Sequence, residues 1–256
     1  SPPPFVALVS CVSQVSRVFP YPRGFPRLPF RAASVTEAFM RRFATLLLDL
    51  DGTLVDAFTT IHRAYCHVLP RFGLPEPSLA EVRNAVGGGL ENAMRRFLRE
   101  DQIPAALRDH IAYTEKILLD DVVLLPGALE LVRERAAAGV TLAAFTNKRG
   151  DHSRRICAHL GLTPHLRGIF GAKDTPWIKP QPEFATHALA ALGADAASTL
   201  LVGDSPFDVA AARNGGFACW AVTTGTHEAG PLREAGAERI FSGLPELHTA
   251  LRAAGG

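Results

Sequence analysis

The feature of this sequence that most limits its possible folds is an alternation of short apolar runs with amphipathic segments that end at glycine. The first run, at 43–50, is almost continuously apolar and leads into acidic residues and a glycine. This pattern is typical of a parallel strand buried on both faces. Similar runs follow at 140–146, 199–202, 217–222 and 239–241. We therefore expect βαβ units that share a mostly parallel sheet.

Helical patterns occupy the intervals between these runs. Residues 128–138, 153–160 and 183–192 carry apolar side chains at helical spacing, and a glycine closes each segment. Glycine after a helix can take the positive φ that ends it. The three glycines are Gly139, Gly161 and Gly193. The pattern predicts the α/β class, with a three-layer Rossmann-like core in which a mostly parallel sheet lies between two helix layers.

One interval breaks the alternation. Residues 57–125 contain no convincing strand, and Ser78 followed by Glu81 forms a capping-box pattern that begins a helix there. The clearest helical stripe in this interval is Phe58, Ile61, Tyr65, Val68, Leu69 and Phe72. We expect 57–125 to form an inserted all-helical cap domain, with the Rossmann-like core made of 43–56 and 126–256.

The N-terminal residues 1–42 differ from the rest in composition. They hold six arginines, one acidic residue and seven of the 19 prolines, a density that neither a helix nor a central strand tolerates. We expect a disordered Pro/Arg-rich extension, which is a leader ahead of a natural start at Met40, a dispensable tail or an organelle-targeting segment. The whole chain has 27 basic and 25 acidic residues, so the remainder holds 21 and 24 and is net negative.

Charge and cysteine usage exclude several functional classes. A net-negative body without a basic stripe argues against a nucleic-acid partner. The apolar run at 5–12 is too short to span a membrane, so we expect no membrane partner. The cysteines lack a CxxC pair, which argues against a zinc site and indicates a reducing, cytoplasmic location. These cysteines are Cys11, Cys66, Cys157 and Cys219. We expect a monomer or a homodimer.

Polar residues gather where the predicted strands end. In an open parallel sheet, ligands bind at the carboxyl ends of the strands. Acidic residues follow the first and third runs, Thr-Asn-Lys ends the second, and a further loop offers a lysine before proline. The residues are Asp49, Asp51, Gly52, Thr146, Asn147, Lys148, Lys179, Asp204, Ser205 and Asp208. Gly52 suggests a turn that separates the roles of the two aspartates beside it.

This collection of side chains suits a cation and a phosphoryl group. Asp49, Asp51 and Asp204 would repel one another unless a hard divalent cation neutralised them, and oxygen ligands in a partly hydrated site favour Mg²⁺. With Lys179 and the Thr146 hydroxyl beside that cation, the pocket suits phosphoryl chemistry, which depends mainly on positioning and charge stabilisation.

Four blocks now carry a resemblance to a known family. DLDGTLVD, TNK, a lone Lys before Pro and GDSPFD, in this order, resemble the four motifs of the haloacid dehalogenase-like hydrolase superfamily over about 43–250. The insert, especially 79–98, is similar to the cap of the phosphoglycolate phosphatase-like group. The resemblance implies a Mg²⁺-dependent phosphomonoester hydrolase that uses an aspartyl-phosphate and acts on a small phosphorylated acid such as 2-phosphoglycolate.

The resemblance also implies catalytic roles. Asp49 would be the nucleophile, and Asp51 would protonate the leaving alkoxide and then deprotonate the water. Thr146 and the backbone amides near Gly52 would hold phosphate oxygens, and Lys179 would offset the negative charge. These residues form the expected catalytic and substrate-binding set.

The metal site implied by the resemblance uses the same strand ends. Mg²⁺ would be held by the Asp49 carboxylate, the Asp51 carbonyl and Asp204, with Asp208 orienting the metal shell. Asn147 is either a further substrate contact or a residue that caps the turn.

Other activities of the same superfamily make different demands on these residues. A dehalogenase would not need a second aspartate as acid and base, so the presence of Asp51 argues against that activity. A phosphonatase needs a lysine in the cap that forms a Schiff base, and Lys116 is the only lysine there. A sugar-phosphate phosphatase or a phosphomutase shares all four motifs and stays open. A non-catalytic phosphate-binding module would be expected to lose Asp49 or the metal carboxylates, which are present here.

Residues in and near the cap bear on specificity. The run Gly87, Gly88 and Gly89 lacks a Walker lysine and is interpreted as a cap loop near the substrate. Trp177 either narrows the entrance or packs against the cap. Arg95, Arg96 and Arg99 are expected to form a solvated helix face, unless one of them, or Arg83, reaches a substrate carboxylate. The cap histidines His62, His67 and His110 are expected at the surface or at the edge of the core.

Overall fold

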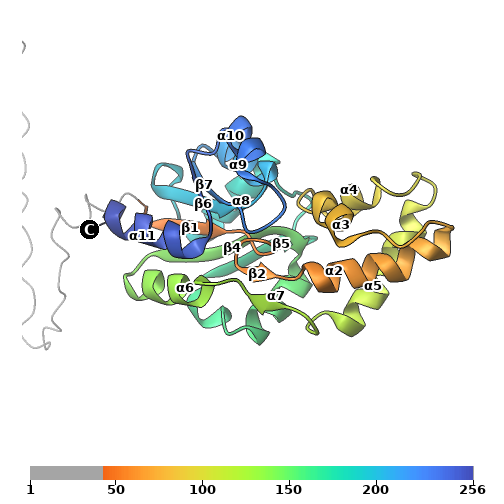
Figure 1. Cartoon of the computed structure of the whole chain (residues 1–256). Coiled ribbons are helices and arrows are strands. Elements are labelled where there is room, and N and C mark those ends of the chain that lie inside the picture. Colours follow the sequence, from red (N-terminus) through yellow and green to blue (C-terminus); the bar gives the residue numbers. More distant parts are fainter. Residues whose placement is uncertain (1–42, 256) are drawn as a thin grey trace, which may run out of the picture. The chain divides into compact units, whose positions relative to one another are not determined.

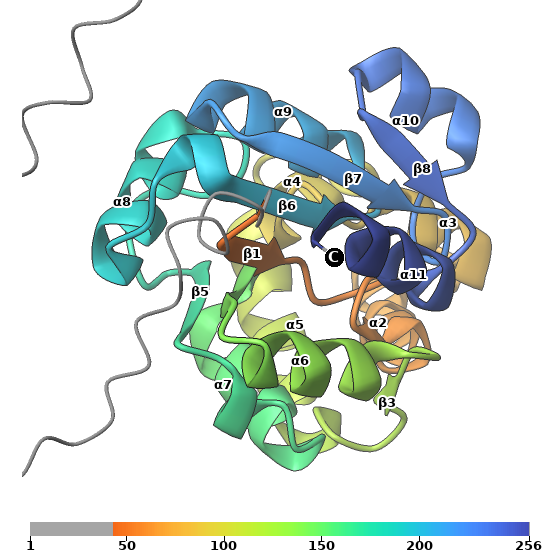
Figure 2. The ribbon, with the colours of Figure 1, turned by 90° about the vertical axis from the view of Figure 1, so that its left-hand side faces the viewer.

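The computed structural model describes residues 43–255, so the extension predicted at 1–42 lies outside the described residues. In the described chain, parallel strands form one sheet in the order β5-β4-β1-β6-β7-β8 (Figures 1 and 2). The strands are β1 Thr45–Leu48, β4 Thr141–Arg149, β5 Gly168–Ala172, β6 Thr199–Gly203, β7 Ala218–Val222 and β8 Arg239–Phe241. Every apolar run predicted as a strand holds a strand of this sheet.

The sheet also contains a strand that the periodicity did not predict. Strand β5 has the sequence GIFGA, in which two glycines and only five residues hide the apolar pattern. A separate antiparallel pair joins β2, Val55–Asp56, to β3, Val123–Leu124. The prediction of no strand in 57–125 is therefore wrong at β3, since two residues are too few to show a period.

The side chains of the central strand alternate between two hydrophobic clusters. Leu46 and Leu48 belong to one cluster, and Leu47 belongs to the other. Helices α6 Ala128–Ala137, α7 Gly150–His159 and α11 Leu244–Gly255 supply the first cluster, whereas α8 Pro182–Leu192 and α9 Pro206–Gly215 supply the second. Helix α10, Ala229–Ala235, packs beside α9. Figures 1 and 2 show these helices on opposite faces of the sheet, which confirms the predicted three-layer core.

The segment 57–125, which we call the cap, has a hydrophobic cluster of its own. It contains α2 Phe58–Val68, α3 Leu79–Ala85, α4 Leu90–Met94 and α5 Ile103–Ile117, with a 3₁₀ turn at Leu69–Phe72. The cluster includes Tyr65, Val68, Leu69, Val82, Met94 and Ile103. The capping box is present as predicted, because Ser78 Oγ accepts from the Glu81 N–H at 3.2 Å and Glu81 accepts from the Ser78 N–H at 2.8 Å. A separate cluster is what an inserted helical domain needs, although the boundaries of that domain stay a prediction.

Glycines end two of the helices at the positions that the sequence predicts. Helix α8 ends at Gly193 with φ 61°, and α6 is followed by Gly139 with φ 79°, both as predicted. Further short 3₁₀ turns occur at Thr163–His165 and Ala196–Ser198.

A bilayer crossing takes about 20 apolar residues. Within 43–255, no helix combines that length with enough apolar character.

Matched Leu→Ala substitutions test the packing. Leu47 is fully buried between the sheet and its second helix layer, whereas Leu79 at the start of α3 is 42% exposed. Leu47→Ala should lower the free energy of unfolding by about 2–5 kcal/mol because it leaves a cavity. Leu79→Ala should change it by less than about 0.5 kcal/mol. Urea titration of both variants measures the difference, and equal effects would contradict the assigned packing.

Candidate active site

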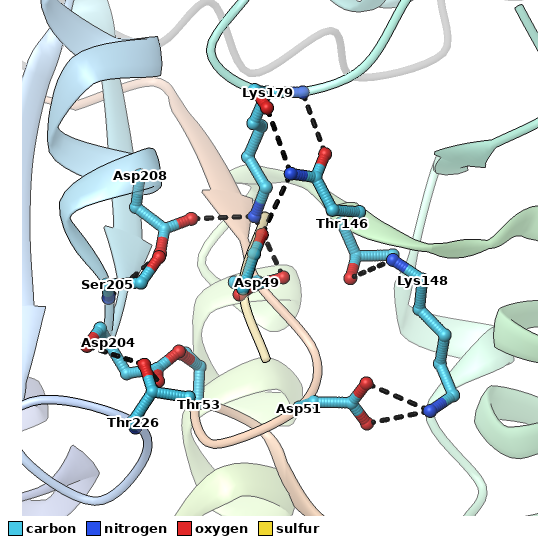
Figure 3. Close-up of polar contacts among 12 residues, drawn as sticks. Asp49, Asp51, Thr53, Thr146, Lys148, Lys179, Asp204, Ser205, Asp208 and Thr226 are labelled. Carbon is cyan, nitrogen blue, oxygen red and sulfur yellow. Dashed lines mark hydrogen bonds and ion pairs between the residues drawn. The ribbon is translucent and has the colours of Figure 1, made fainter. Parts of the chain in front are cut away.

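The site lies where three neighbouring strands end. In the sheet, β1 pairs with β4 on one side and with β6 on the other, so Leu48 is level with Ala144 and Val202. The chain therefore brings the residues that follow β1, those at the end of β4 and those after β6 to one edge, as Figure 3 shows. Strand order reverses at this point, which is where open α/β sheets bind ligands.

The Lys179 ammonium joins two aspartates at the centre of the site. Its Nζ lies 2.9 Å from Asp49 Oδ1 and 2.6 Å from Asp208 Oδ1, and its side chain is almost fully buried (Figure 3). Burial alone would lower the pKa of Lys179, but the adjacent charges of Asp208 and Asp49 outweigh it and raise that pKa. The lysine is therefore charged, and its removal would leave two buried carboxylates without their counter-ion.

The two acidic residues of the GDSPFD block are held in different ways. Asp204 accepts from Thr53 Oγ1 at 3.2 Å, from the Thr226 N–H at 2.6 Å and from Thr226 Oγ1 at 2.7 Å. Asp208 accepts from Lys179 through Oδ1 and from the Ser205 N–H and Oγ through Oδ2. Ser205 precedes α9 as its N-cap, with Pro206 as the first helical residue. Both Asp208 oxygens are thus engaged by protein donors.

Asp49, Asp204 and Asp208 form a cluster that could hold a metal ion. One oxygen of each lies within 4.8 Å of the others, and all three residues are buried. Burial and the charges of Asp49 and Asp208 raise the pKa of Asp204 to about 8. Burial also raises the pKa of Asp49 to about 6, although Lys179 opposes that shift. Three buried carboxylates against one lysine leave an excess of negative charge, and all the donors are oxygens, so the residues present fit Mg²⁺.

Asp51 points away from Asp49, as the turn at Gly52 predicts. Both Asp51 carboxylate oxygens accept from Lys148 Nζ, at 3.1 and 2.9 Å (Figure 3). Gly52 has φ 82°, and a Cβ there would lie 2.6 Å from the Gly225 Cα and 2.8 Å from an Asp204 oxygen. The tight approach of these segments therefore requires glycine, and it separates the two aspartates into different environments.

Asn147 ties three segments together. Its Nδ2 donates to the carbonyls of Gly87 and Lys179, each at 2.9 Å, and its Oδ1 accepts from the Lys179 N–H at 2.7 Å. All of these contacts are to main chain, which matches the turn-holding alternative for Asn147. Thr146, beside it, is buried and its Oγ1 accepts from the Lys148 N–H at 3.2 Å.

A cavity of about 390 Å³ opens onto these residues. The core contributes Asp49, Asp51, Thr146, Asn147, Lys148 and Asp204 to its wall. The cap contributes residues of α2, α4 and α5 and the loop Gly87, Gly88 and Gly89. The glycine loop therefore lies at the cavity, as the sequence predicts.

The structure bears on three expectations about residues near the cavity. Trp177 does not line the cavity, and it packs against the cluster formed with α8 and α9. Its neighbour Ile178 lines the cavity, and a Cβ on Gly89 would lie 3.3 Å from Ile178 Cδ1. His110 does not lie at the surface, since it is buried, and it lines the cavity. The lysine that a phosphonatase would need, Lys116, is exposed on α5 and lies outside the cavity wall.

Of the cap arginines, Arg95 lies on the wall of this cavity. It pairs with Glu91 at 2.6 Å and with Glu100 at 2.9 Å. Arg83 stacks on the ring of Phe58, 4.3 Å from its centroid. Arg95 is therefore at the cavity but paired with two glutamates, and Arg83 is held against an aromatic ring.

Sequence reasoning missed three residues of the site. Lys148 is the last residue of the TNK block and Thr53 belongs to the DGT block. Both lie inside recognised motifs, but no role was predicted for either side chain. Thr226 carried no motif signal. It does follow β7 within the polar run 223–226, and the rule that places ligands at strand ends could have found it.

Comparisons with known proteins agree with this geometry. A profile described as haloacid dehalogenase-like hydrolase matches residues 46–222. A probable phosphatase, IndB, of Dickeya dadantii (strain 3937) is 30% identical over 208 residues, covering 79% of this chain and 90% of that protein. A phosphoglycolate phosphatase of Caulobacter vibrioides is 30% identical over 205 residues, covering 77% and 86%. The crystal structure of a predicted phosphoglycolate phosphatase from Haemophilus somnus 129pt has a TM-score of 0.76 at 26% identity, covering 82% and 98%.

The raised carboxyl pKa values predict how a cation should affect stability. A carboxyl whose pKa is higher in the folded than in the unfolded chain loses stabilisation as pH rises between the two values. Without metal, Asp204 and Asp49 should therefore destabilise the fold as pH rises towards about 8. Mg²⁺ competes with these protons, so the increase in Tm that it produces should grow from about pH 5 to pH 8.

Thermal unfolding with and without Mg²⁺ measures this effect. At roughly 100 times the dissociation constant, Mg²⁺ should raise Tm by about 5 °C or more near pH 8. Asp204→Asn should remove the increase, and the control Asp101→Asn, at an exposed position in the cap, should keep it. A Mg²⁺ effect that is equal in both variants would contradict the assigned site.

Proposed function

The chain belongs to the haloacid dehalogenase-like hydrolase family, and we propose that it is a Mg²⁺-dependent phosphomonoester hydrolase that works through an aspartyl-phosphate on Asp49. Relatives that match most of its length bear the names of phosphatases, and phosphatase is the enzyme class of this chain. The observation that carries the mechanism is the separation of two aspartates at one cavity. Asp49 lies against Lys179, and Asp51 lies against Lys148.

In the first step, a carboxylate oxygen of Asp49 attacks the phosphorus of the ester. The new bond from oxygen to phosphorus forms as the bond from phosphorus to the leaving alkoxide breaks. Lys179, 2.9 Å from Asp49 Oδ1, offsets the charge of the nucleophile and of the phosphoryl oxygens. The Thr146 hydroxyl, on the same wall of the cavity, donates to a phosphoryl oxygen.

Asp51 moves the protons. It protonates the alkoxide as it leaves, and it then takes a proton from the water that attacks the aspartyl-phosphate. That second displacement releases inorganic phosphate and restores the Asp49 carboxylate. Lys148 donates to both Asp51 oxygens, so it holds the Asp51 carboxyl away from the Asp49–Lys179 pair.

The metal would be held by oxygens of Asp49 and Asp204 and by the Asp51 carbonyl. When bound, Mg²⁺ supplies positive charge that offsets the phosphoryl and carboxylate oxygens. In this proposal Asp208 does not bind the metal directly, because its two carboxylate oxygens already accept hydrogen bonds from Lys179 and Ser205. It therefore positions Lys179 and the start of α9.

A small phosphorylated acid such as 2-phosphoglycolate is the first candidate substrate. Relatives named as phosphoglycolate phosphatases support it, and the cavity wall carries Lys173 and Arg149 in addition to Lys148. A panel of phosphate esters, assayed for phosphate release with Mg²⁺ and with EDTA, tests the substrate class and the metal together. Phosphate release without an isomeric product separates a phosphatase from a phosphomutase, and full activity in EDTA would contradict the scheme.

A cytoplasmic location is part of the proposal. The described cysteines Cys66, Cys157 and Cys219 are all free thiols. Burial raises the pKa of the Cys157 thiol to about 12, which keeps it unreactive. Free, inert thiols are compatible with a reducing compartment.

Asp49→Asn tests the covalent mechanism. Because an amide cannot act as the nucleophile, kcat for phosphate release should fall by about 10⁴-fold or more. The matched control is Asp195→Asn, at an exposed position ahead of the 3₁₀ turn before β6, which should keep the kcat of the wild type. Turnover by Asp49→Asn at the rate of the control variant would contradict the covalent mechanism through Asp49.

Asp51→Asn tests the role of the second aspartate. On an alkyl phosphate, loss of the acid and base should lower kcat by about 10²–10⁴-fold. On p-nitrophenyl phosphate the leaving group needs no proton, so the first step should survive and the phosphoryl-enzyme should accumulate. Intact-protein mass spectrometry would then show the added mass of one phosphoryl group, which the double variant with Asp49→Asn should lack. A phosphoryl group on the double variant would contradict the assignment of Asp49.

A further inference from the structure

Two cap helices line the cavity with one face each. The α2 side consists of Ala57, Thr60, Ile61 and Tyr65, and the α5 side consists of Leu107, His110, Ile111, Thr114 and, just beyond the helix, Leu118. We call these nine residues the cap pocket. Helices α2 and α5 pack against each other in the cap. None of the nine side chains is acidic, lysine or arginine, in contrast to the wall formed by the core.

Three polar atoms of the cap pocket lack partners. Thr60 Oγ1, Tyr65 Oη and His110 Nε2 are buried and make no hydrogen bond with any residue in the described part of the chain. The three side chains are only 3%, 1% and 6% exposed. Buried polar side chains nearly always have a hydrogen-bond partner. Three exceptions on one wall of the cavity indicate that these groups serve a ligand.

The environment of His110 keeps this wall uncharged. Burial lowers the pKa of His110 to about 3, and the nearby charges of Lys148 and His152 act in the same direction. The Thr114 Oγ1 lies 3.3 Å from His110 Nδ1, which leaves Nε2 for a ligand. The Tyr65 ring meets the imidazole edge-on, with ring centroids 5.2 Å apart. Neutral hydroxyl and imidazole groups offer hydrogen bonds to a ligand without attracting its charge.

We propose that Thr60, Tyr65 and His110 bind the distal end of a neutral, hydroxyl-bearing leaving group, so that the enzyme hydrolyses polyol or sugar phosphates in addition to small phosphorylated acids. This inference rests on the proposed phosphatase activity and names a substrate class for the same site. Hydroxyl groups both donate and accept, so they match three neutral partners. The carbon skeleton would lie against the apolar side chains of the pocket.

A carboxylate is a poor occupant of the cap pocket. It would be buried among apolar side chains and neutral polar groups without a cation of its own, which is costly. Lys148, whose charge reaches His110, is already paired with Asp51. A two-carbon acid would remain near the core wall, where Lys148, Arg149 and Lys173 lie. A cavity of about 390 Å³ is within the range of pockets that hold larger ligands.

Two esters of equal length test this inference. Sorbitol 6-phosphate and 6-phosphogluconate differ only at the distal carbon, which bears a hydroxyl in the first and a carboxylate in the second. With Mg²⁺ and the full-length enzyme, kcat/KM should be at least about 10-fold higher for sorbitol 6-phosphate, because the cap pocket pairs a hydroxyl and leaves a carboxylate unpaired.

Tyr65→Phe and Thr60→Val each remove one unpartnered hydroxyl with little change in shape. Either variant should lower the preference for sorbitol 6-phosphate by about 5–10-fold. Tm should stay equal to or above that of the wild type, since no protein hydrogen bond is lost. The control is Tyr113→Phe on α5, whose ring stacks on His67 at 3.9 Å and lies outside the cavity wall. It should keep the preference of the wild type.

The outcomes separate the inference from the function on which it rests. Phosphate release with equal or reversed preference, or a preference that Tyr65→Phe and Thr60→Val leave unchanged, would overturn the inference alone. A large drop in Tm for both variants would assign the hydroxyls to the folded structure and would also overturn it. Failure of the wild type to release phosphate from any ester would overturn the proposed function and this inference with it.

Discussion

The ion pairs made by the buried Lys179 ammonium are the interaction on which the site depends. The lysine lies within 3 Å of carboxylate oxygens of Asp49 and Asp208, yet Asp204 stands in the same cluster without a cation of its own. Hydroxyl and amide donors from Thr53 and Thr226 hold Asp204 in place, but burial and the neighbouring carboxylates still raise its pKa to about 8. The folded chain therefore presents a buried excess of negative charge that a divalent cation would relieve.

The sheet and the cap contribute different groups to the cavity. Buried strands β1, β4 and β6 fix the positions of the charged groups, because their ends are level and their side chains are locked between two helix layers. The cap adds a wall of different chemistry, with neutral polar groups on α2 and α5. Asn147 links the two by holding both the Lys179 loop and the Gly87 carbonyl of the cap. The proposed phosphoryl chemistry and the proposed recognition of the leaving group thus use separate parts of one cavity.

The strength of each local signal explains what the sequence could predict. Apolar runs, closing glycines and the Ser78 capping box predicted most strands and helix ends, because each depends on a few neighbouring residues. Strand β5 and the two-residue β3 were not predicted, because neither is long or apolar enough to show the alternating pattern of a strand. Asp49 and Asp204 are close together in the structure, as the strand-end rule predicts. The contact between Lys148 and Asp51 spans 97 residues, and no local pattern encodes the direction of those side chains.

The proposed mechanism requires that Asp49 and its neighbours form the phosphoryl site. A crystal structure of the protein soaked with Mg²⁺ and orthovanadate tests it most directly. We expect vanadium at a carboxylate oxygen of Asp49, with the cation against Asp49 and Asp204. The described chain holds a second group of potential ligands, Glu115, Asp151 and His152, between α5 and α7. A cation bound there, with vanadate away from Asp49, would contradict the central claim.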